Sequence, residues 1–489
     1  MAQVAIPLVR VLDATGGTAL RGQSGEEYSS VTIDSRAVAP GALFFAVKGD
    51  RFDGHDFAIS AIAAGAHGIV VARGRGAAFD HDCTVIEVDD PVRALGALAA
   101  AHRQAMAQLE VVAITGSNGK TTTKEMVASI LSAAAGGDAV LKTEGNLNNH
   151  LGVPLTLLRL HEGHRYAVVE MGMSNLGEIA YLTGLARPDV AVVVSVAGVH
   201  VETLGSIENV ARAKAEIFAG LDEDGIAIYP ATESLLLPYL GALAHKMTFG
   251  PKAVSPTVAY DEVKPGPTGL DLRLHLAGVT SSAGIDAHLP LIGGHNASNA
   301  AAAACVALAL DVGEGSILDG LATVKPAKHR AQLMQVGSYT VLDDCYNAAP
   351  NSMRAALDSL AEITPPGAQK IAVLGDMLEL GPQSAQLHAD IGEYAAERVD
   401  YLITLGPQSV AMNEAARPRL GDRMLHTEDP KDAADKICEV GRAGDVVLVK
   451  ASRGLRLERV IDALTAVCQR PRGGDHEAPG PGPGREEES

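Results

Sequence analysis

Short apolar runs and helical patterns alternate along most of the chain. Residues 111–114 form a continuous β-branched run, which is typical of a strand buried on both faces of a sheet. Residues 124–131 follow with apolar side chains at helical spacing. More strands, separated by helical segments, are predicted at residues 167–169, 190–195 and 225–229. The alternation predicts an α/β unit with a mostly parallel sheet.

Two further α/β units flank the central one. The first has short apolar strands around one helical segment, which is predicted at residues 58–66. In the last, helical segments separate strands that end in loops, predicted within residues 341–352, 371–381, 401–406 and 446–450, which is the pattern of a Rossmann-like, doubly wound sheet. Three domains also suit the length of 489 residues, which is too long for one core. The predicted domains are residues 1–107, 108–325 and 326–470.

The last residues differ in composition from the rest. Residues 471–489 are rich in Pro, Gly and charged residues and contain too few apolar side chains to form a core. We therefore expect this tail to be disordered.

A phosphate-binding loop is predicted between the strand at 111–114 and the helix that follows. Glycines let the backbone approach an anion, and amide groups at a helix start point towards it. Lys120 adds a positive charge, and Thr121 offers a hydroxyl group to a magnesium ion. A tight turn that only caps the helix is the alternative, but Gly-Lys-Thr in this context favours phosphate binding. The predicted loop residues are Gly116, Ser117, Asn118, Gly119, Lys120, Thr121 and Thr122.

Other polar residues stand near the ends of predicted elements. Glu170 and His200 follow strands, where they could reach a metal ion beside the phosphates, although a capping carboxylate and an ordinary loop histidine are the alternatives. Lys214 lies on a predicted helix and, taken alone, is expected to be solvated. Asn296 and Asn299 share one face at the start of an Ala-rich helix, where they either cap the helix or bind a base edge.

Composition narrows the class of protein. A net charge of −19 argues against nucleic acid as the main partner, because no basic surplus exists to neutralise phosphates. No export signal and no membrane-spanning apolar segment are predicted. Five cysteines lack CxxC or zinc-finger spacing, so we expect reduced thiols in a cytoplasmic protein; they are Cys83, Cys305, Cys345, Cys438 and Cys468.

The combined motifs resemble those of the Mur ligases of peptidoglycan synthesis, over nearly the whole chain to about residue 465. Besides TGSNGKTTTKE, they include EMG at 170–172, AKAEI at 213–217 and HNASNA at 295–300. DDCYNAAPNSM at 343–353 and LGDMLELG at 374–381 resemble most closely the branch that adds D-alanyl-D-alanine. The resemblance implies three domains, which hold the UDP-substrate, ATP, and the remaining nucleotide and dipeptide contacts in that order.

The same resemblance implies the reaction. ATP would phosphorylate the terminal carboxylate of UDP-N-acetylmuramoyl-tripeptide, and the amine of D-alanyl-D-alanine would then displace phosphate from the acyl phosphate. The resemblance also implies two Mg²⁺ ions, held by Thr121, Glu170 and His200, with Lys214 as a carbamate near them. Lys120, Glu170, His200 and Lys214 are the expected catalytic residues. We expect a monomer.

The resemblance assigns the remaining contacts. Beyond the phosphate loop, the nucleotide contacts would be Asn296, Asn299, Arg330, Asp344, Tyr346 and Asn347. The substrate contacts would be Ser35, Arg36, Phe45, Thr143, Asn146, Asn148, Asn149, Lys450, Ser452 and Arg453. Read without the resemblance, Ser35 and Arg36 belong to a plain charged turn. Three positions depart from the family pattern: Ser195 and Ala349, where Asn is expected, and Ala451, where Gly is expected.

Three alternatives stay open on the sequence. One is the ligase that adds the third amino acid, although the DNPR motif of its diaminopimelate-adding members is absent. Another is the related folylpolyglutamate synthase branch. The last is a nucleotide-binding protein without ligase activity, which the joint presence of Lys120, Glu170, His200 and Lys214 argues against.

Overall fold

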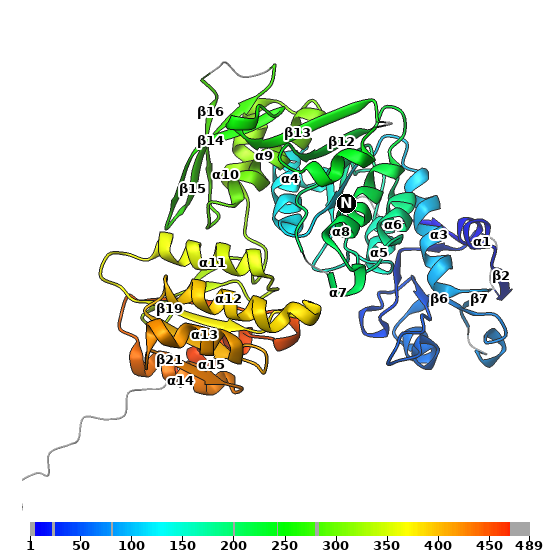
Figure 1. Ribbon diagram of the computed structural model, residues 1–489. Coiled ribbons are helices and arrows are strands. Elements are labelled where there is room, and N and C mark those ends of the chain that lie inside the picture. The colour runs from blue at the N-terminus through cyan, green and yellow to red at the C-terminus, as the bar shows by residue number, and fades with distance from the viewer. Residues whose placement is uncertain are drawn as a thin grey trace, which may run out of the picture.

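Three α/β domains follow one another along the chain, as the sequence predicts. The computed structural model describes residues 5–21, 25–79, 82–198, 201–241, 243–278 and 283–469. In Figure 1 the central domain, cyan to green, lies between the first domain in blue and the third in yellow to red. His200 and the predicted tail at 471–489 lie outside the described residues.

The first domain is built on a five-stranded sheet in the order β2-β7-β6-β5-β4, in which only the β2–β7 pair is antiparallel. A two-stranded antiparallel sheet, β1-β3, lies beside it. Its helix α2 is shorter than predicted, because it ends at Ala63 and the chain turns at Gly65, where φ is 107°. The elements are β1 (Ile6–Pro7), α1 (Leu8–Thr15), β2 (Thr18–Arg21), β3 (Glu27–Tyr28), β4 (Ser30–Thr32), β5 (Ala42–Phe45), α2 (Ala58–Ala63), β6 (Ala66–Ala72), β7 (Thr84–Val88) and α3 (Pro91–Gln104).

The central domain has a nine-stranded sheet in the order β16-β15-β14-β13-β12-β11-β8-β10-β9. It is parallel except at β14–β15 and β15–β16. The strands are β8 (Glu110–Thr115), β9 (Val140–Lys142), β10 (Tyr166–Glu170), β11 (Val190–Val193), β12 (Ile226–Pro230), β13 (His245–Pro251), β14 (Val258–Gly266), β15 (Gly269–Leu276) and β16 (Ile285–Leu289). The helices are α4 (Lys120–Ala135), α5 (Gly152–Leu157), α6 (Glu178–Ala186), α7 (Val201–Leu204), α8 (Ile207–Ala215), α9 (Asn296–Ala309) and α10 (Glu314–Thr323).

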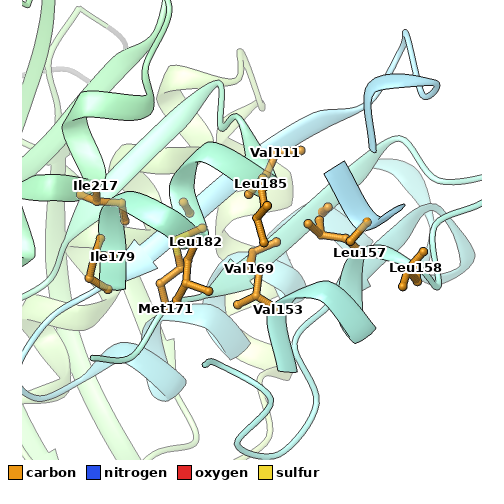
Figure 2. Close-up of a cluster of buried hydrophobic side chains, with 14 of the residues drawn as sticks. Val111, Val153, Leu157, Leu158, Val169, Met171, Ile179, Leu182, Leu185 and Ile217 are labelled. Atoms are coloured by element: carbon orange, nitrogen blue, oxygen red, sulfur yellow. The ribbon is translucent and has the colours of Figure 1, made fainter. Parts of the chain in front are cut away.

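Both faces of the central sheet are covered, which explains the continuous apolar run in β8. Val111 and Ala113 belong to the core on the side of α5 and α6, whereas Val112 and Ile114 belong to the core on the side of α4, α9 and α10. Figure 2 shows Val111 near side chains of α5 and α6. Helix α3 of the first domain packs against α5 and α6 and extends this core, so the first domain is joined to the central one by apolar contacts.

The third domain has a six-stranded sheet in the order β17-β18-β22-β19-β20-β21, with only β17 antiparallel. Helices cover both of its faces, as in a doubly wound fold. The strands are β17 (Gln332–Val336), β18 (Tyr339–Asp343), β19 (Lys370–Gly375), β20 (Tyr401–Leu405), β21 (Met424–Thr427) and β22 (Val446–Lys450). The helices are α11 (Pro350–Ile363), α12 (Ser384–Ala396), α13 (Val410–Leu420), α14 (Pro430–Val440) and α15 (Glu458–Cys468). Within the described ranges, no helix is long and apolar enough to cross a bilayer.

Helices α4 and α10 cross in very close contact, and this crossing holds the helix that begins at the phosphate loop. A Cβ atom on Gly320 would lie 2.3 Å from Cα of Ile130, so only glycine fits there. The Ser129 hydroxyl donates a hydrogen bond of 2.7 Å to the Gly320 carbonyl across the same contact.

We predict that Gly320→Ala destabilises the protein. Ala favours a helix by about 1 kcal/mol over Gly, but overpacking against a backbone costs about 1–3 kcal/mol, so the clash outweighs the gain. Gly315→Ala is the matched control on the same helix, because a Cβ there meets nothing within 4 Å. Thermal unfolding of both variants should show a lower melting temperature for Gly320→Ala and an equal or higher one for Gly315→Ala. Equal melting temperatures for the two variants would contradict the contact.

Candidate active site

Strand order brings the predicted phosphate loop, Glu170 and Ser195 to one edge of the central sheet. Strand β8 lies between β10 and β11, and the three run parallel. The loop follows β8, Glu170 ends β10, and Ser195 stands just beyond β11. Because carboxyl ends of parallel strands meet at the same edge, residues far apart in the sequence become neighbours.

Ser195 holds the phosphate loop in shape. Its Oγ accepts a hydrogen bond of 2.9 Å from the Asn118 amide and donates one of 2.9 Å to the Asn118 carbonyl. Its own carbonyl accepts from the Ser117 amide at 2.9 Å. The Ser117 hydroxyl in turn bonds to the carbonyl and amide of Ala197. Serine thus fills the position where the family pattern has Asn, and the amides of Ser117 and Asn118 are already engaged.

Gly119 closes the loop under a tight steric constraint. Its φ is 82°, and a Cβ there would lie 2.4 Å from Oδ1 of Asn299. Helix α4 begins at the next residue. The amides of Lys120, Thr121 and Thr122, in its first turn, have no acceptor within the helix and are available to an anion.

The Lys120 side chain lies within the loop and is surrounded by protein, although it stays accessible from the cavity described below. Its Nζ donates a hydrogen bond of 2.7 Å to the Gly116 carbonyl. Burial lowers the pKa of Lys120, Glu170 opposes that effect, and Arg330 adds to it. Lys120, Glu170 and Arg330 are therefore close enough to interact electrostatically.

Glu170 is buried at 2% exposure and held in place by two neighbours. Its Oε1 accepts a hydrogen bond of 2.9 Å from Nδ2 of Asn148, and its backbone amide donates one of 2.9 Å to Oγ1 of Thr143. The Thr143 carbonyl accepts from the buried Lys124 at 2.8 Å. Oε2 of Glu170 has no hydrogen-bond partner among the described residues. An unpartnered buried carboxylate oxygen fits a metal ligand.

Lys214 is buried on α8, at 2% exposure, so the expectation of a solvated lysine is wrong. Its side chain has no hydrogen bond or ion pair with any described residue. Burial, and to a lesser degree the charge of Lys120, lowers the pKa of Lys214 well below its ordinary value. The lowered pKa increases the fraction of Lys214 that carries a neutral amine.

A cavity of about 290 Å³ lies between the central and third domains. The central domain contributes the loop and the start of α9, and the third domain contributes residues after β18 and at the end of β22. The predicted residues that line it are Ser117, Asn118, Gly119, Lys120, Thr121, Thr122, Asn296, Asn299, Arg330, Asp344, Tyr346, Asn347 and Lys450. Glu170 and Lys214 are not among its lining residues.

Polar contacts order the part of the cavity that the third domain contributes. Lys450, predicted as a substrate contact, pairs with Oδ2 of Asp344 at 2.5 Å and donates to the Asn347 carbonyl at 3.0 Å. Oδ1 of Asp344 accepts from the Ala331 amide. The Arg330 guanidinium lies over the Tyr346 ring, 4.2 Å from its centroid.

Asn296 and Asn299 do not cap α9, because no side-chain cap bond is present at its start. Nδ2 of Asn299 donates to Oδ1 of Asn296 at 2.9 Å, and Nδ2 of Asn296 donates to the Ile292 carbonyl at 2.8 Å. Each amide nitrogen keeps one N–H for another acceptor. The capping alternative is therefore wrong.

Other predicted substrate contacts do not line the cavity. Arg36 is exposed and pairs with Asp34 at 2.7 Å beside the half-buried Ser35, which matches the plain charged turn. Phe45 departs from the prediction: it is 0% exposed in the core, because β5 is covered on both faces. Asn149 Oδ1 accepts from the amides of Leu151 and Gly152 at the start of α5.

The remaining predicted contacts are Asn146, Ser452 and Arg453. Asn146 is exposed. Ser452 is buried and accepts from the Leu378 amide, while Arg453 pairs with Glu458 at 3.0 Å. None of the three lines the cavity.

Cavity residues that sequence reasoning missed include Glu125, His295, Lys325, Asn351, Ser352 and Ser359. Most of these residues lie within or next to the predicted motifs, so closeness in sequence to HNASNA and DDCYNAAPNSM could have identified them. His295 lines the cavity and is exposed to solvent there, although much of its surroundings is protein. Burial lowers its pKa, so the neutral imidazole is favoured.

Neighbours compensate for the two other departures from the family pattern. Ala349 precedes α11 without a capping side chain, and the Ser352 hydroxyl bonds to its amide and carbonyl, each at 3.0 Å. The Ala451 methyl group fills space beside Gly375, where an added Cβ would lie 2.7 Å from it.

Comparisons with known proteins agree with this geometry. Three family models match: "Mur ligase family, catalytic domain" at residues 27–103, "Mur ligase middle domain" at 114–307 and "Mur ligase, glutamate ligase domain" at 329–453. A relative from Escherichia coli K12, UDP-N-acetylmuramoyl-tripeptide–D-alanyl-D-alanine ligase, is 39% identical over 89% of this chain and 93% of its own length.

Solved structures of Mur ligases are also similar to this chain. A crystal structure of MurF from Acinetobacter baumannii is 33% identical, covers 95% of this chain and 100% of that one, and has a TM-score of 0.85. A MurF structure from Thermotoga maritima in complex with ADP is 29% identical, covers 90% and 98%, and has a TM-score of 0.78. The chain therefore belongs to the Mur ligase family.

Proposed function

We propose that this protein ligates D-alanyl-D-alanine to UDP-N-acetylmuramoyl-tripeptide at the expense of ATP, through an acyl phosphate. The observation that carries the proposal is the cavity that joins the phosphate loop to Asp344, Tyr346, Asn347 and Lys450 of the DDCYNAAPNSM region and β22. The names of the E. coli relative and of both crystal structures support the same activity. No observation on the described residues specifically favours the other branches of the family or the non-catalytic alternative.

We assign ATP to this cavity. Lys120 and the first-turn amides of α4 would hold the β- and γ-phosphates, with Arg330 beside them. The free N–H groups of Asn296 and Asn299 would face acceptors on the adenine. Asp344, already fixed by Lys450 and the Ala331 amide, would accept from the ribose hydroxyl groups.

Magnesium fits the oxygen donors near Lys120. Thr121 and the unpartnered Oε2 of Glu170 would hold one ion, and His200 and a carbamylated Lys214 would complete a second site. When bound, such ions offset negative charge as phosphate moves to a carboxylate. Asn148 and Thr143 orient Glu170 for this task, because both of their hydrogen bonds constrain its position.

The first domain would hold the UDP end of the substrate near Ser35 and Arg36, whose side chains are not buried. Asn146 stands exposed where that substrate would reach the central domain.

We propose domain boundaries at residues 107 and 325, a monomeric protein and a cytoplasmic location, where ATP and UDP-activated sugars are present. No role is proposed for nucleic acid or membrane.

We predict which acceptor the enzyme uses. With ATP, Mg²⁺ and UDP-N-acetylmuramoyl-tripeptide, phosphate release should depend on D-alanyl-D-alanine and not on diaminopimelate, lysine or glutamate. Phosphate release that depends on one of the single amino acids would assign the protein to another branch of the family. No release with any acceptor would favour a non-catalytic nucleotide-binding protein.

We predict that Lys120→Ala lowers turnover by at least about 100-fold, as expected when one preorganised charge that stabilises a transition state is removed. The fold should persist, because among the described residues Lys120 Nζ bonds only to carbonyls of its own loop. Lys431→Ala, which removes an exposed lysine on α14, is the control. Near-normal turnover in a folded Lys120→Ala protein would overturn the assignment of the phosphate loop.

We predict that Lys214 carries a carbamate. Its neutral amine would attack carbon dioxide, and one proton would be lost to solvent as the N–C bond forms. With ¹³C-bicarbonate, a carbamate carbon resonance should appear in the native protein and be absent from Lys214→Ala. Because only the neutral amine reacts, the resonance and the ligase activity should both fall as pH drops through the lowered pKa of Lys214. A resonance that survives in Lys214→Ala would place the carbamate elsewhere.

A further inference from the structure

We propose that His329, Asp343 and Cys345 form a zinc-binding site. None of these three residues lines the nucleotide cavity. The site belongs to the third domain, whereas Thr121, Glu170 and Lys214, assigned to magnesium, belong to the central domain.

The donor atoms come from two parts of the third domain. His329 lies in the linker that precedes β17, whereas Asp343 ends β18 and Cys345 follows it. One atom each from His329, Asp343 and Cys345 lies within 4.8 Å of the others. Asp343 stands between its neighbours, with Oδ2 2.7 Å from Nδ1 of His329 and Oδ1 2.9 Å from Sγ of Cys345. Oε2 of Glu458 lies 4.0 Å from the same sulfur.

Charge around the cluster favours a cation. Asp343 and Cys345 are buried, at 2% and 0% exposure, and Glu458 is partly buried. Lys450 pairs with Asp344 and Arg453 with Oε1 of Glu458, so these two cations are already engaged. Asp343 has no Lys or Arg partner among the described residues; its only ionic neighbour there is His329. A buried carboxylate without a permanent cation fits a metal ligand.

The kinds of donor select the metal. A thiolate, an imidazole and a carboxylate suit zinc, and a water molecule would complete its tetrahedral geometry. Magnesium requires oxygen donors and octahedral geometry, so millimolar Mg²⁺ supplied for ATP would not compete. Zinc would replace the hydrogen bonds that now join Asp343 to its neighbours, and the Cys345 thiol would release its proton to solvent.

The position of the site links it to the nucleotide cavity. The Tyr346 amide donates to the His329 carbonyl at 3.1 Å, and Asp344 accepts from the Ala331 amide at 3.1 Å. A metal bound by His329 and Cys345 would therefore tie the interdomain linker to the strand end that presents Asp344 and Tyr346. Zinc would stabilise the third domain at this junction.

The test uses the full-length protein, first treated with a chelator and then dialysed. Titration with Zn²⁺ against a chromophoric chelator, in excess Mg²⁺ and without nucleotide, should give one site per chain and a raised melting temperature. Co²⁺ in place of Zn²⁺ should give a sulfur-to-cobalt charge-transfer band and the d–d bands of a tetrahedral ion. Since neither readout involves ligation, the site and the proposed ligase activity can fail independently.

Variants identify the ligands. Cys345→Ser and His329→Gln should each weaken zinc binding by more than about 100-fold, because even second-shell changes cost about 10–100-fold. Cys438→Ser, which changes a cysteine on α14, should bind zinc like the native protein. The proposal is overturned if the native protein shows no stoichiometric zinc or no cobalt–thiolate band. It is equally overturned if a folded Cys345→Ser or His329→Gln protein binds as the native one does.

Discussion

The site depends on the close packing of the phosphate loop between the residues after β11 and the start of α9. Ser195 bonds to both backbone groups of Asn118, and Asn299 leaves no room for a side chain at Gly119. Because the loop is constrained on two sides, the free amides at the start of α4 need no further ordering, so less conformational entropy opposes anion binding. The dense contact of α4 with α10 at Gly320 keeps the helix behind the loop in place.

A second set of hydrogen bonds connects helix α4 to Glu170. Lys124, nearly inaccessible on α4, bonds to the Thr143 carbonyl, and Thr143 Oγ1 accepts from the Glu170 amide. The segment after β9 thus connects the phosphate-loop helix to the end of β10. Asn148 adds a bond to one carboxylate oxygen, and the other has no partner among the described residues. The same few contacts fix the position of the Glu170 carboxylate and leave one of its oxygens free to bind a metal ion. This arrangement suits a metal ligand.

The sequence predicted the features that local pattern controls. The buried run of β8, the loop and the helix after it are contiguous, so their order alone specifies the cradle. Lys214 and Phe45 show where this approach fails, because their burial depends on elements far along the chain. The Asn296–Asn299 pair was ambiguous for the same reason, since the choice between capping and a base edge requires the position of Ile292 and Gly119. The cluster of His329, Asp343 and Cys345 has no recognisable spacing, because it forms only when the linker and the end of β18 come together.

The cavity is shared between two domains, and this division has a chemical consequence. An acyl phosphate is destroyed by water, so a ligase must exclude solvent while the amine attacks. A site within one rigid domain would need a permanent opening for three substrates. Here the linker between α10 and β17 carries His329 and Ala331 at φ values of 60° and 46°, and both contact the strand end that bears Asp344 and Tyr346. Backbone held in that sparsely populated region costs about 1–3 kcal/mol per residue and persists only where surrounding contacts enforce it. Small changes in the linker would thus alter how Asp344 and Tyr346 face the phosphate loop, which lets domain position control when the site is complete.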